Sequence, residues 1–195
     1  MGGTDGLVRS TLTVGERRRP APDERLFLTW PGLFRWASRT TFRLSPRSRL
    51  RRALLVRNVQ LSYEGQNRDD WRLTLLLYDD DSELLNVPIR GGGSRVAGVG
   101  FSYRGVDGAR RLAEDWVEPW EQVRFLPSEI LDAGDGRLLV LSHMVARGRG
   151  SGVEVTERLA QLIEFSGGRV RRQRNWLGSW DDGLEAVANE EPHRI

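Results

Sequence analysis

The chain has 195 residues, a formal net charge of +3 and no cysteine. This length suits one domain with a hydrophobic core and is short for two. Without cysteine there are no disulfides and no thiol catalysis, and two histidines are too few for a multi-histidine metal site. All 30 basic residues are arginine, which excludes Schiff-base lysine chemistry and a phosphate-binding loop ending in Gly-Lys. No apolar run reaches the ~20 residues that span a bilayer, and the N-terminus lacks a signal-peptide layout, so we expect a cytoplasmic protein with no metal and no membrane span.

The positive charge is concentrated at the start of the chain. Residues 1–52 hold 12 arginines and 4 acidic residues, whereas residues 53–195 hold 18 arginines and 23 acidic residues. We expect residues 1–47 to be a basic extension, disordered or loosely docked, before a domain over 48–190 and a tail over 191–195. Nucleic-acid binders carry positive charge on the folded domain, so we predict no nucleic-acid partner.

Residues 24–44 mix aromatic and aliphatic side chains with arginine. This composition leaves three interpretations: a segment that binds a membrane surface or a partner, a loose cap on the domain, or translated sequence upstream of the true start. A tether through residues 1–52 is therefore one functional hypothesis.

The first half of the domain is predicted to be mainly helical. Apolar spacing predicts a helix from about Ser48 to Gly65. A second helix is predicted over Asp70–Tyr78 with Asn67 as its N-cap, followed by a strand near Glu83–Pro88 and a glycine-rich loop over Arg90–Gly100.

The next helix has the clearest apolar stripe in the chain. Its stripe consists of Ala109, Leu112, Ala113, Trp116, Val117 and Trp120. Asp107 is the expected N-cap, and Pro119 ends the helix or bends its last turn. A strand over Val123–Asp132 follows, and a short helix over Asp181–Ala188 is expected near the end of the chain.

Residues 137–177 alternate apolar and polar residues around two glycine turns, which predicts a long antiparallel meander. Gly167-Gly168 suits a two-residue hairpin, because both turn positions need positive φ. Symmetric closure of the loop Gly148–Gly152 pairs His143 with Glu157. One face of the sheet then gathers Leu141, His143, Val145, Val155, Glu157, Leu159, Gln161, Ile163, Arg172, Arg174 and Trp176. Apolar side chains with a few convergent polar groups are typical of a small-molecule cavity.

The order of these elements and several local strings resemble the nuclear transport factor 2-like (NTF2-like) superfamily, in its SnoaL-like, polyketide cyclase-like branch. The strings are QNRDDWRLTLLLYDDDSEL (66–84), YRGVDGARRLAEDWVEPWEQVRF (103–125), DAGDGRLLVLSHMVARGRGSGVEV (132–155) and FSGGRVRRQRNWL (165–177). The resemblance covers roughly residues 55–188. It implies an α+β fold, a cone-shaped barrel of a curved antiparallel sheet covered by three to four helices around a hydrophobic pocket. It also implies that a homodimer is common and that no cofactor is needed.

In cyclase-like relatives an aspartate after the aromatic residue of the last strand acts as general acid and base. The matching position here is Gly178, and Asp181 follows three residues later. Many proteins of this branch have no known activity. Two hypotheses therefore stand: a cofactor-free isomerase, cyclase or epoxide hydrolase for a small apolar molecule, or a non-catalytic ligand-binding or dimerisation module.

In the enzyme hypothesis Glu157 is the base and His143 its partner, and Asp181 reaches back toward them. A carboxylate beside an imidazole in a dry pocket can exchange protons near neutral pH. The alternative is a cross-strand salt bridge on a wet outer face. Arg172 or Arg174 would stabilise an oxyanion, or would lie on the solvated side of an edge strand. The remaining expected pocket residues are Trp176, Gln161, Trp116 and Tyr78.

Overall fold

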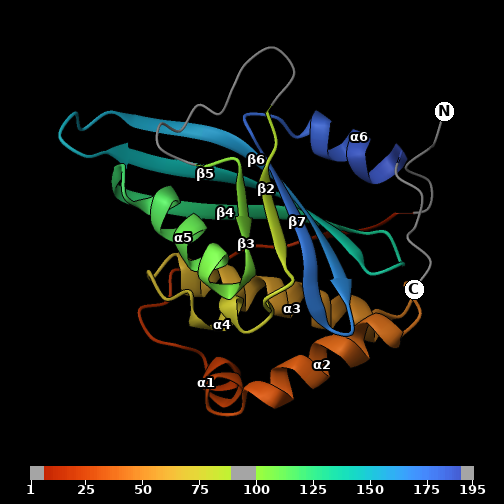
Figure 1. Cartoon of the computed structure of the whole chain (residues 1–195). Helices are drawn as coiled ribbons and strands as arrows, with labels where there is room; N and C mark the ends of the chain where they lie inside the picture. Colours follow the sequence, from red (N-terminus) through yellow and green to blue (C-terminus); the bar gives the residue numbers. More distant parts are fainter. Residues whose placement is uncertain (1–6, 89–99, 190–195) are drawn as a thin grey trace.

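The computed structural model describes residues 7–88 and 100–189. Within them, the chain forms a curved, open seven-stranded sheet and six helices, which confirms the expected α+β cone (Figure 1). The strands are β1 (Val8–Thr11), β2 (Glu83–Asn86), β3 (Ser102–Arg104), β4 (Trp120–Asp132), β5 (Arg137–Gly148), β6 (Glu154–Ser166) and β7 (Arg169–Leu177). The helices are α1 (Pro22–Thr29), α2 (Pro31–Arg43), α3 (Arg49–Gln66), α4 (Arg72–Leu75), α5 (Gly105–Val117) and α6 (Asp181–Asn189). The predicted tail, and all of the predicted glycine-rich loop except its last residue, fall outside the described residues or at their edge.

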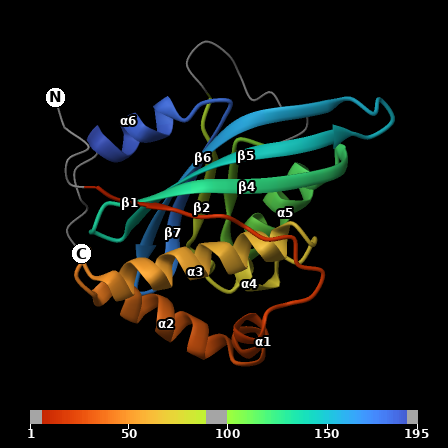
Figure 2. The same cartoon turned by 180° about the vertical axis from the view of Figure 1, so that it is seen from behind.

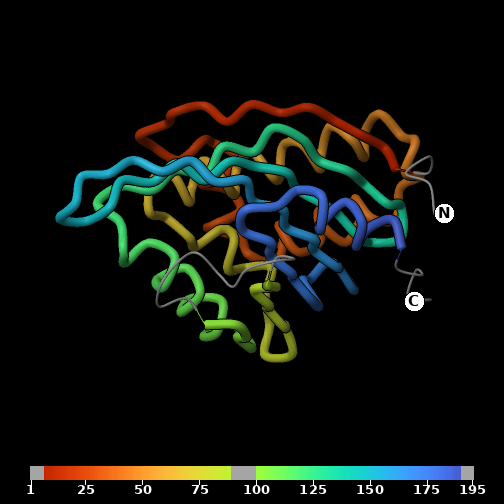
Figure 3. The backbone as a smooth tube through the Cα atoms, turned by 90° about the horizontal axis from the view of Figure 1, so that it is seen from above, coloured from red at the N-terminus to blue at the C-terminus, as the bar shows by residue number. Residues whose placement is uncertain are grey.

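The sheet has the order β1-β4-β5-β6-β7-β2-β3 and separates two hydrophobic layers. Its concave face packs on α3 and α5 in the main core, whereas α6 covers part of the convex face in a second core (Figures 1 and 3). The helices α1 and α2 lie beyond α3 and α4, on the side away from the sheet (Figures 1 and 2). The concave side is therefore enclosed between strands and helices.

Two of the predicted helix starts are corrected by the structure. The helix α3 begins as expected, and the Ser48 Oγ accepts a hydrogen bond from the Arg51 N–H at its start. The next helix, α4, has only one turn, and Asn67 does not cap it. Instead Asn67 ends α3, and its side chain bonds both backbone groups of Phe125 in β4, at 2.9 and 2.7 Å. Asp107 lies within the first turn of α5 and is not its cap, because α5 begins two residues earlier.

Residues 8–43, expected to be disordered or loosely docked, form β1, α1 and α2 and make buried contacts. The strand β1 pairs with β4, and Phe34 of α2 is fully buried. A buried ion pair joins Arg51 of α3 to Asp132 of β4 through two hydrogen bonds of 2.7 Å. The same guanidinium donates to the backbone carbonyls of Phe42 and Leu44, so the end of α2 is held to the sheet through α3.

The strand register of the meander is where the sequence prediction was wrong. The Gly167-Gly168 turn is confirmed, and Ser166 pairs with Arg169 as predicted. One pair further on, a bulge leaves Arg171 without a partner in the ladder, so Glu164 pairs with Arg172. In the other hairpin, Arg147 pairs with Glu154, one residue later than predicted.

A shift of one residue moves every following side chain to the opposite face of a sheet. His143 therefore pairs with Arg158, not with Glu157, which lies opposite Met144. The expected single face is divided between the two sides of the sheet. The side of Leu159, Gln161 and Ile163 faces the concave core, and the side of Leu141 and Trp176 faces α6.

An uncharged cavity inside the cone as the candidate functional site

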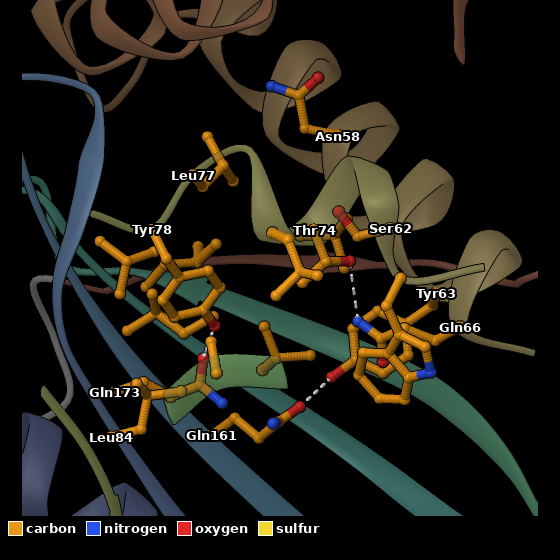
Figure 4. Close-up of a pocket in the computed structure, with 18 of the residues that line it drawn as sticks. Asn58, Ser62, Tyr63, Gln66, Thr74, Leu77, Tyr78, Leu84, Gln161 and Gln173 are labelled. Atoms are coloured by element: carbon orange, nitrogen blue, oxygen red, sulfur yellow. Dashed lines mark hydrogen bonds between the residues drawn. The ribbon is translucent and has the colours of Figure 1, made fainter. Parts of the chain in front are cut away.

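A cavity of about 110 Å³ lies between the concave face of the sheet and the helices (Figure 4). A cavity volume of ~10–15 Å³ is enough to hold one water molecule. This cavity therefore has room for a ligand of roughly ten non-hydrogen atoms. Most of its wall is apolar. The larger apolar side chains are Phe34, Phe42, Leu55, Val59, Trp71, Leu75, Leu77, Leu84, Leu112, Trp116, Phe125, Leu138, Val140, Ile163, Phe165 and Val170.

Two tyrosines and three amides form a hydrogen-bonded chain along the cavity. The Tyr63 hydroxyl of α3 donates to Oε1 of Gln161, and the Tyr78 hydroxyl donates to Oε1 of Gln173 (Figure 4). The Nε2 groups of both glutamines donate to Oδ1 of Asn175, at 3.0 and 2.8 Å. Both branches of the chain thus end on one oxygen atom of β7.

The chain continues out of the cavity through the edge of the sheet. Asn175 donates from Nδ2 to Oδ1 of Asn86 at 3.0 Å, and Asn86 donates to the carbonyl of Gly100 at 2.7 Å. Each amide nitrogen carries two hydrogens. After these bonds, Gln161 and Gln173 each keep a second N–H, which a ligand oxygen can accept.

No aspartate, glutamate, arginine or histidine is among the described residues that line the cavity. Burial raises the pKa of Tyr63 and of Tyr78 well above the ordinary value, and for Tyr78 the nearby Tyr63 adds to the effect. Both hydroxyls are therefore protonated near neutral pH. The cavity presents polar groups of both donor and acceptor type, but no charge.

The helical side of the cavity is formed by α2, α3, α4 and α5. Gln66 of α3 donates to the Thr74 hydroxyl of α4 at 3.2 Å, which joins the two helices at the rim (Figure 4). The inner face of α2 contributes Phe34, Ser38 and Phe42 to the wall. The Phe42 ring packs on Phe165 of β6, with ring centroids 4.5 Å apart. The helix α2 thus completes this side of the cavity.

Three of the residues predicted for the pocket line this cavity: Gln161, Trp116 and Tyr78. Glu157 is half-buried on the concave side of β6 but lies outside the lining. His143 lies on the convex side, where its ring packs edge-on against Trp180, with centroids 4.7 Å apart. The predicted Glu157–His143 pair is thus absent because of the register shift.

The other predicted site residues lie on the convex side or at the edge of the sheet. Arg172 pairs with Glu83 at 3.0 Å, and Arg174 pairs with Glu164 at 3.0 Å. Trp176 is buried in the core under α6, with the Arg174 guanidinium 5.6 Å from its ring. Asp181 is exposed in the first turn of α6. None of these four side chains lines the described cavity.

Tyr63, Gln173 and Asn175 line the cavity but were not predicted from the sequence. A usable signal was present in β7, where neutral amides alternate with arginines in the string Arg172-Gln173-Arg174-Asn175. Arginine is almost never fully buried without a partner, whereas a neutral amide is readily buried once hydrogen-bonded. Gln173 and Asn175 were therefore better candidates than the arginines for the positions that face the interior.

Comparisons with known proteins agree with the fold. No family model matches the chain, and no curated protein matches it. An NTF2-like protein of unknown function from Burkholderia pseudomallei K96243 is 19% identical, with a TM-score of 0.53 over 69% of this chain and 96% of that one. TerC, co-crystallised with polyporic acid, is 18% identical, with a TM-score of 0.52 over 68% of this chain and 96% of that one. A protein from Jannaschia sp. CCS1 described as SnoaL-like polyketide cyclase is 14% identical, with a TM-score of 0.50 over 70% and 92%.

The chain therefore has the fold of NTF2-like proteins, with the cavity of the cone as its candidate site. Its resemblance to NTF2-like and SnoaL-like proteins is confirmed at the level of the fold. About a third of the chain lies outside each of these superpositions.

Proposed function

We propose that this protein binds a small, uncharged, largely apolar molecule in the cavity of the cone and does not transform it. The observation that carries the proposal is the lining itself: hydroxyls and amides are present, and no ionisable group that is active near neutral pH is found among the described lining residues. A buried charged ligand needs a paired group of opposite charge. An uncharged ligand is therefore the better fit.

The distribution of side chains suggests the kind of molecule. Trp71 and Trp116 both pack on Phe125, with ring centroids 6.1 and 5.7 Å apart, and the three form an aromatic part of the wall. The second N–H groups of Gln161 and Gln173 provide donors in another part of the wall. A compact ring compound with one carbonyl or hydroxyl oxygen satisfies both parts. TerC, a neighbour in fold, was crystallised with an organic molecule, which supports a ligand site in this fold.

The enzyme hypothesis now lacks its base within the cavity. General acid–base catalysis needs a group within hydrogen-bond reach of the substrate and with a pKa near the working pH. Glu157 lies outside the lining, and both cavity tyrosines have raised pKa values. Catalysis is therefore the outcome that would contradict our proposal.

The homodimer implied by the resemblance stays a prediction, which sedimentation analysis would test.

The test is a thermal-shift screen with pairs of ring compounds that differ only in charge, for example neutral ketones, alcohols or phenols against carboxylates of the same shape. A true ligand at a hundredfold excess over its Kd should add about 2.7 kcal/mol of stability. Gln173→Leu should then weaken binding about tenfold or more, because one hydrogen bond to the ligand is lost.

Arg172→Gln is the matched control, because it changes the neighbouring residue of the same strand on the opposite face. Its affinity for the ligand should equal that of the unmodified protein. Preferential binding of the carboxylates would refute an uncharged site. If the unmodified protein converts a ligand and the Glu157→Gln variant does not, the enzyme hypothesis would be restored.

A further inference from the structure

The surface of the N-terminal helices has an unusual composition. Residues 25–63 contain nine arginines and no aspartate or glutamate. Three of these arginines have partners within the protein: Arg51 with Asp132, Arg57 with Asp23, and Arg35 with the carbonyl of Leu76. The other six are exposed, and no ion pair joins any of them to another of the described residues. They are Arg25, Arg39, Arg43, Arg47, Arg49 and Arg52.

Large apolar side chains are exposed in the same region. Trp30 and Trp36 are 62% and 63% exposed, and Leu26 and Leu50 are 44% and 58% exposed. Four of the seven large hydrophobic residues exposed in the described part of the chain thus fall within 25 residues of sequence. Exposed apolar side chains that gather in one region and are rimmed by polar residues mark interaction sites.

The helix α2 has two different faces. Phe34, Ser38 and Thr41 are buried, whereas Trp36, Arg39 and Arg43 are exposed on the opposite side. Their spacing of three and four residues puts the tryptophan and both arginines on one stripe of the helix. Figures 1 and 2 show α1 and α2 together at the end of the molecule away from the sheet.

We propose that this surface, which we call the basic helical face (Leu26, Trp30, Trp36, Arg39 and Arg43, extended by Arg47, Arg49 and Leu50), docks on an anionic lipid bilayer. Tryptophan and arginine at helix surfaces are the side chains that settle in the headgroup region, where the ring is half-buried and the guanidinium meets lipid phosphate. Each arginine near such a surface contributes about fivefold to the affinity. No helix among the described residues is long and apolar enough to cross a membrane, so the contact is peripheral.

Charge argues for this occupant over a second copy of the chain. The four arginines of the basic helical face, which form no ion pair with the described residues, would repel those of a second copy across a symmetric contact. A nucleic-acid duplex would satisfy the arginines but would leave two tryptophans and two leucines without an apolar partner. A bilayer interface satisfies both groups of side chains.

The position of α2 connects this face to the cavity. Its inner stripe, Phe34 and Ser38, lines the cavity, and its outer stripe belongs to the basic helical face. Docking would therefore turn the helical wall of the cavity toward the lipid, where an apolar ligand is concentrated. This last step rests on the proposed function; the docking itself does not.

The experiment measures binding of the full chain, without added ligand, to vesicles of phosphatidylcholine alone and of phosphatidylcholine mixed with phosphatidylglycerol. We expect sedimentation with the mixed vesicles only, weakened by salt. Arg39→Gln with Arg43→Gln should weaken binding by about tenfold or more, since two arginines are lost. Trp30→Ser with Trp36→Ser should weaken it similarly and abolish the vesicle-induced change in tryptophan fluorescence.

Two matched controls change the same chemistry elsewhere. Arg110→Gln with Arg111→Gln removes the same charge from exposed positions of α5, and Phe101→Ser with Val153→Ser removes side chains that are 61% and 59% exposed. Both should bind like the unmodified protein, and thermal unfolding verifies that every variant is folded. Equal weakening by the control variants, no binding to anionic vesicles, or binding to a DNA duplex instead would overturn the proposal. Tyr78→Phe should leave vesicle binding unchanged, so a failure of the ligand site and a failure of docking are distinguishable.

Discussion

The two faces of β7 have opposite chemistry. On the concave face, β6 and β7 present Gln161, Gln173 and Asn175, which are hydrogen-bonded to one another and carry no charge. On the convex face, alternate residues of β7 are arginines, each in an ion pair with a neighbouring strand: Arg172 with Glu83 of β2, and Arg174 with Glu164 of β6. Side-chain charge is therefore a better guide than turn geometry to which alternate residues of a strand face a cavity. The reason is that burying a neutral amide costs far less free energy than burying a guanidinium.

The sharpest way to break this comparison is to remove the centre of the concave network. Asn175→Ala deprives both glutamine Nε2 groups and the Asn86 Oδ1 of a partner in a buried setting. We expect a loss of roughly 3 kcal/mol in the free energy of unfolding, because each unsatisfied buried group costs about 1–3 kcal/mol. Urea denaturation measures it.

The control for this loss is Arg172, on the opposite face of the same strand. Arg172→Ala removes an ion pair whose side chains are 37% and 46% exposed, so we expect no more than about 0.5 kcal/mol. Losses of equal size at the two positions would contradict the division of the sheet into a closed and an open face.

The second prediction concerns the hairpin tip where the sheet meets α2. Gly168 has φ +84°, and a Cβ there would lie 2.7 Å from the backbone nitrogen of Arg39. Its neighbour Gly167 has φ +60° and open space around it. Gly167→Ala should cost about 1–2 kcal/mol from backbone strain alone. Gly168→Ala should cost about 1–2 kcal/mol more, because α2 must move away.

Proteolysis in the α1–α2 region would show where the extra cost of Gly168→Ala arises. That variant should be cleaved faster there than Gly167→Ala at equal protease concentration. Equal cleavage and equal stability would mean that α2 does not depend on the hairpin for its position.

The third prediction uses pH. The pKa is raised for all three tyrosines: by burial for Tyr63 and Tyr78, and to about 12 for Tyr103 by burial and by its hydrogen bond to Asp115. A raised pKa in the folded state means that stability is complete below the unfolded value of about 10 and falls as the pH rises above it.

Ultraviolet titration of the folded protein should therefore show no tyrosinate near pH 10, whereas the chain in concentrated guanidinium chloride ionises there. Tyr63→Phe with Tyr78→Phe should reduce the loss of stability between about pH 9 and 11. Two tyrosines that ionise near pH 10 in the folded protein would place them in contact with water.

Much of the fold could be predicted because its signals are local. Ser48 caps α3, the stripe at Leu112 and Trp116 is the buried face of α5, and Gly167-Gly168 forms the predicted hairpin. The site could not be predicted in the same way, because its geometry depends on register. The extra residue at Arg171 has no local signature, and the loop after Gly148 can close in two ways that differ by one residue.

The N-terminal helices illustrate the same limit. Their sequence is basic and rich in aromatic residues, and this composition alone does not distinguish a loose extension from helices that pack on the domain. Two long-range contacts determine that these helices pack on the domain: Phe42 contacts Phe165, and Arg51 forms an ion pair with Asp132. Neither partner can be identified from the helix itself. Tyr63 likewise belongs to the cavity only because β6 brings Gln161 to it.

The last prediction has the smallest expected effect on stability and addresses the register directly. Because the chain has no cysteine, introduced cysteine pairs can be cross-linked without background. His143→Cys with Arg158→Cys places two thiols on directly opposite residues of β5 and β6, where Cβ atoms are about 4.5–5.5 Å apart. A short thiol reagent should join them efficiently.

The competing pair, His143→Cys with Glu157→Cys, should cross-link poorly, because adjacent residues of a strand point to opposite faces. Ser166→Cys with Arg169→Cys is the positive control, since this pair is opposite in both registers. Stability should change by no more than about 1 kcal/mol in the His143 and Arg158 pair, because the two side chains lose only their contacts with the Trp180 ring. Efficient cross-linking of His143→Cys to Glu157→Cys would return the carboxylate and the imidazole to one face. The uncharged cavity would then no longer be the whole of the site.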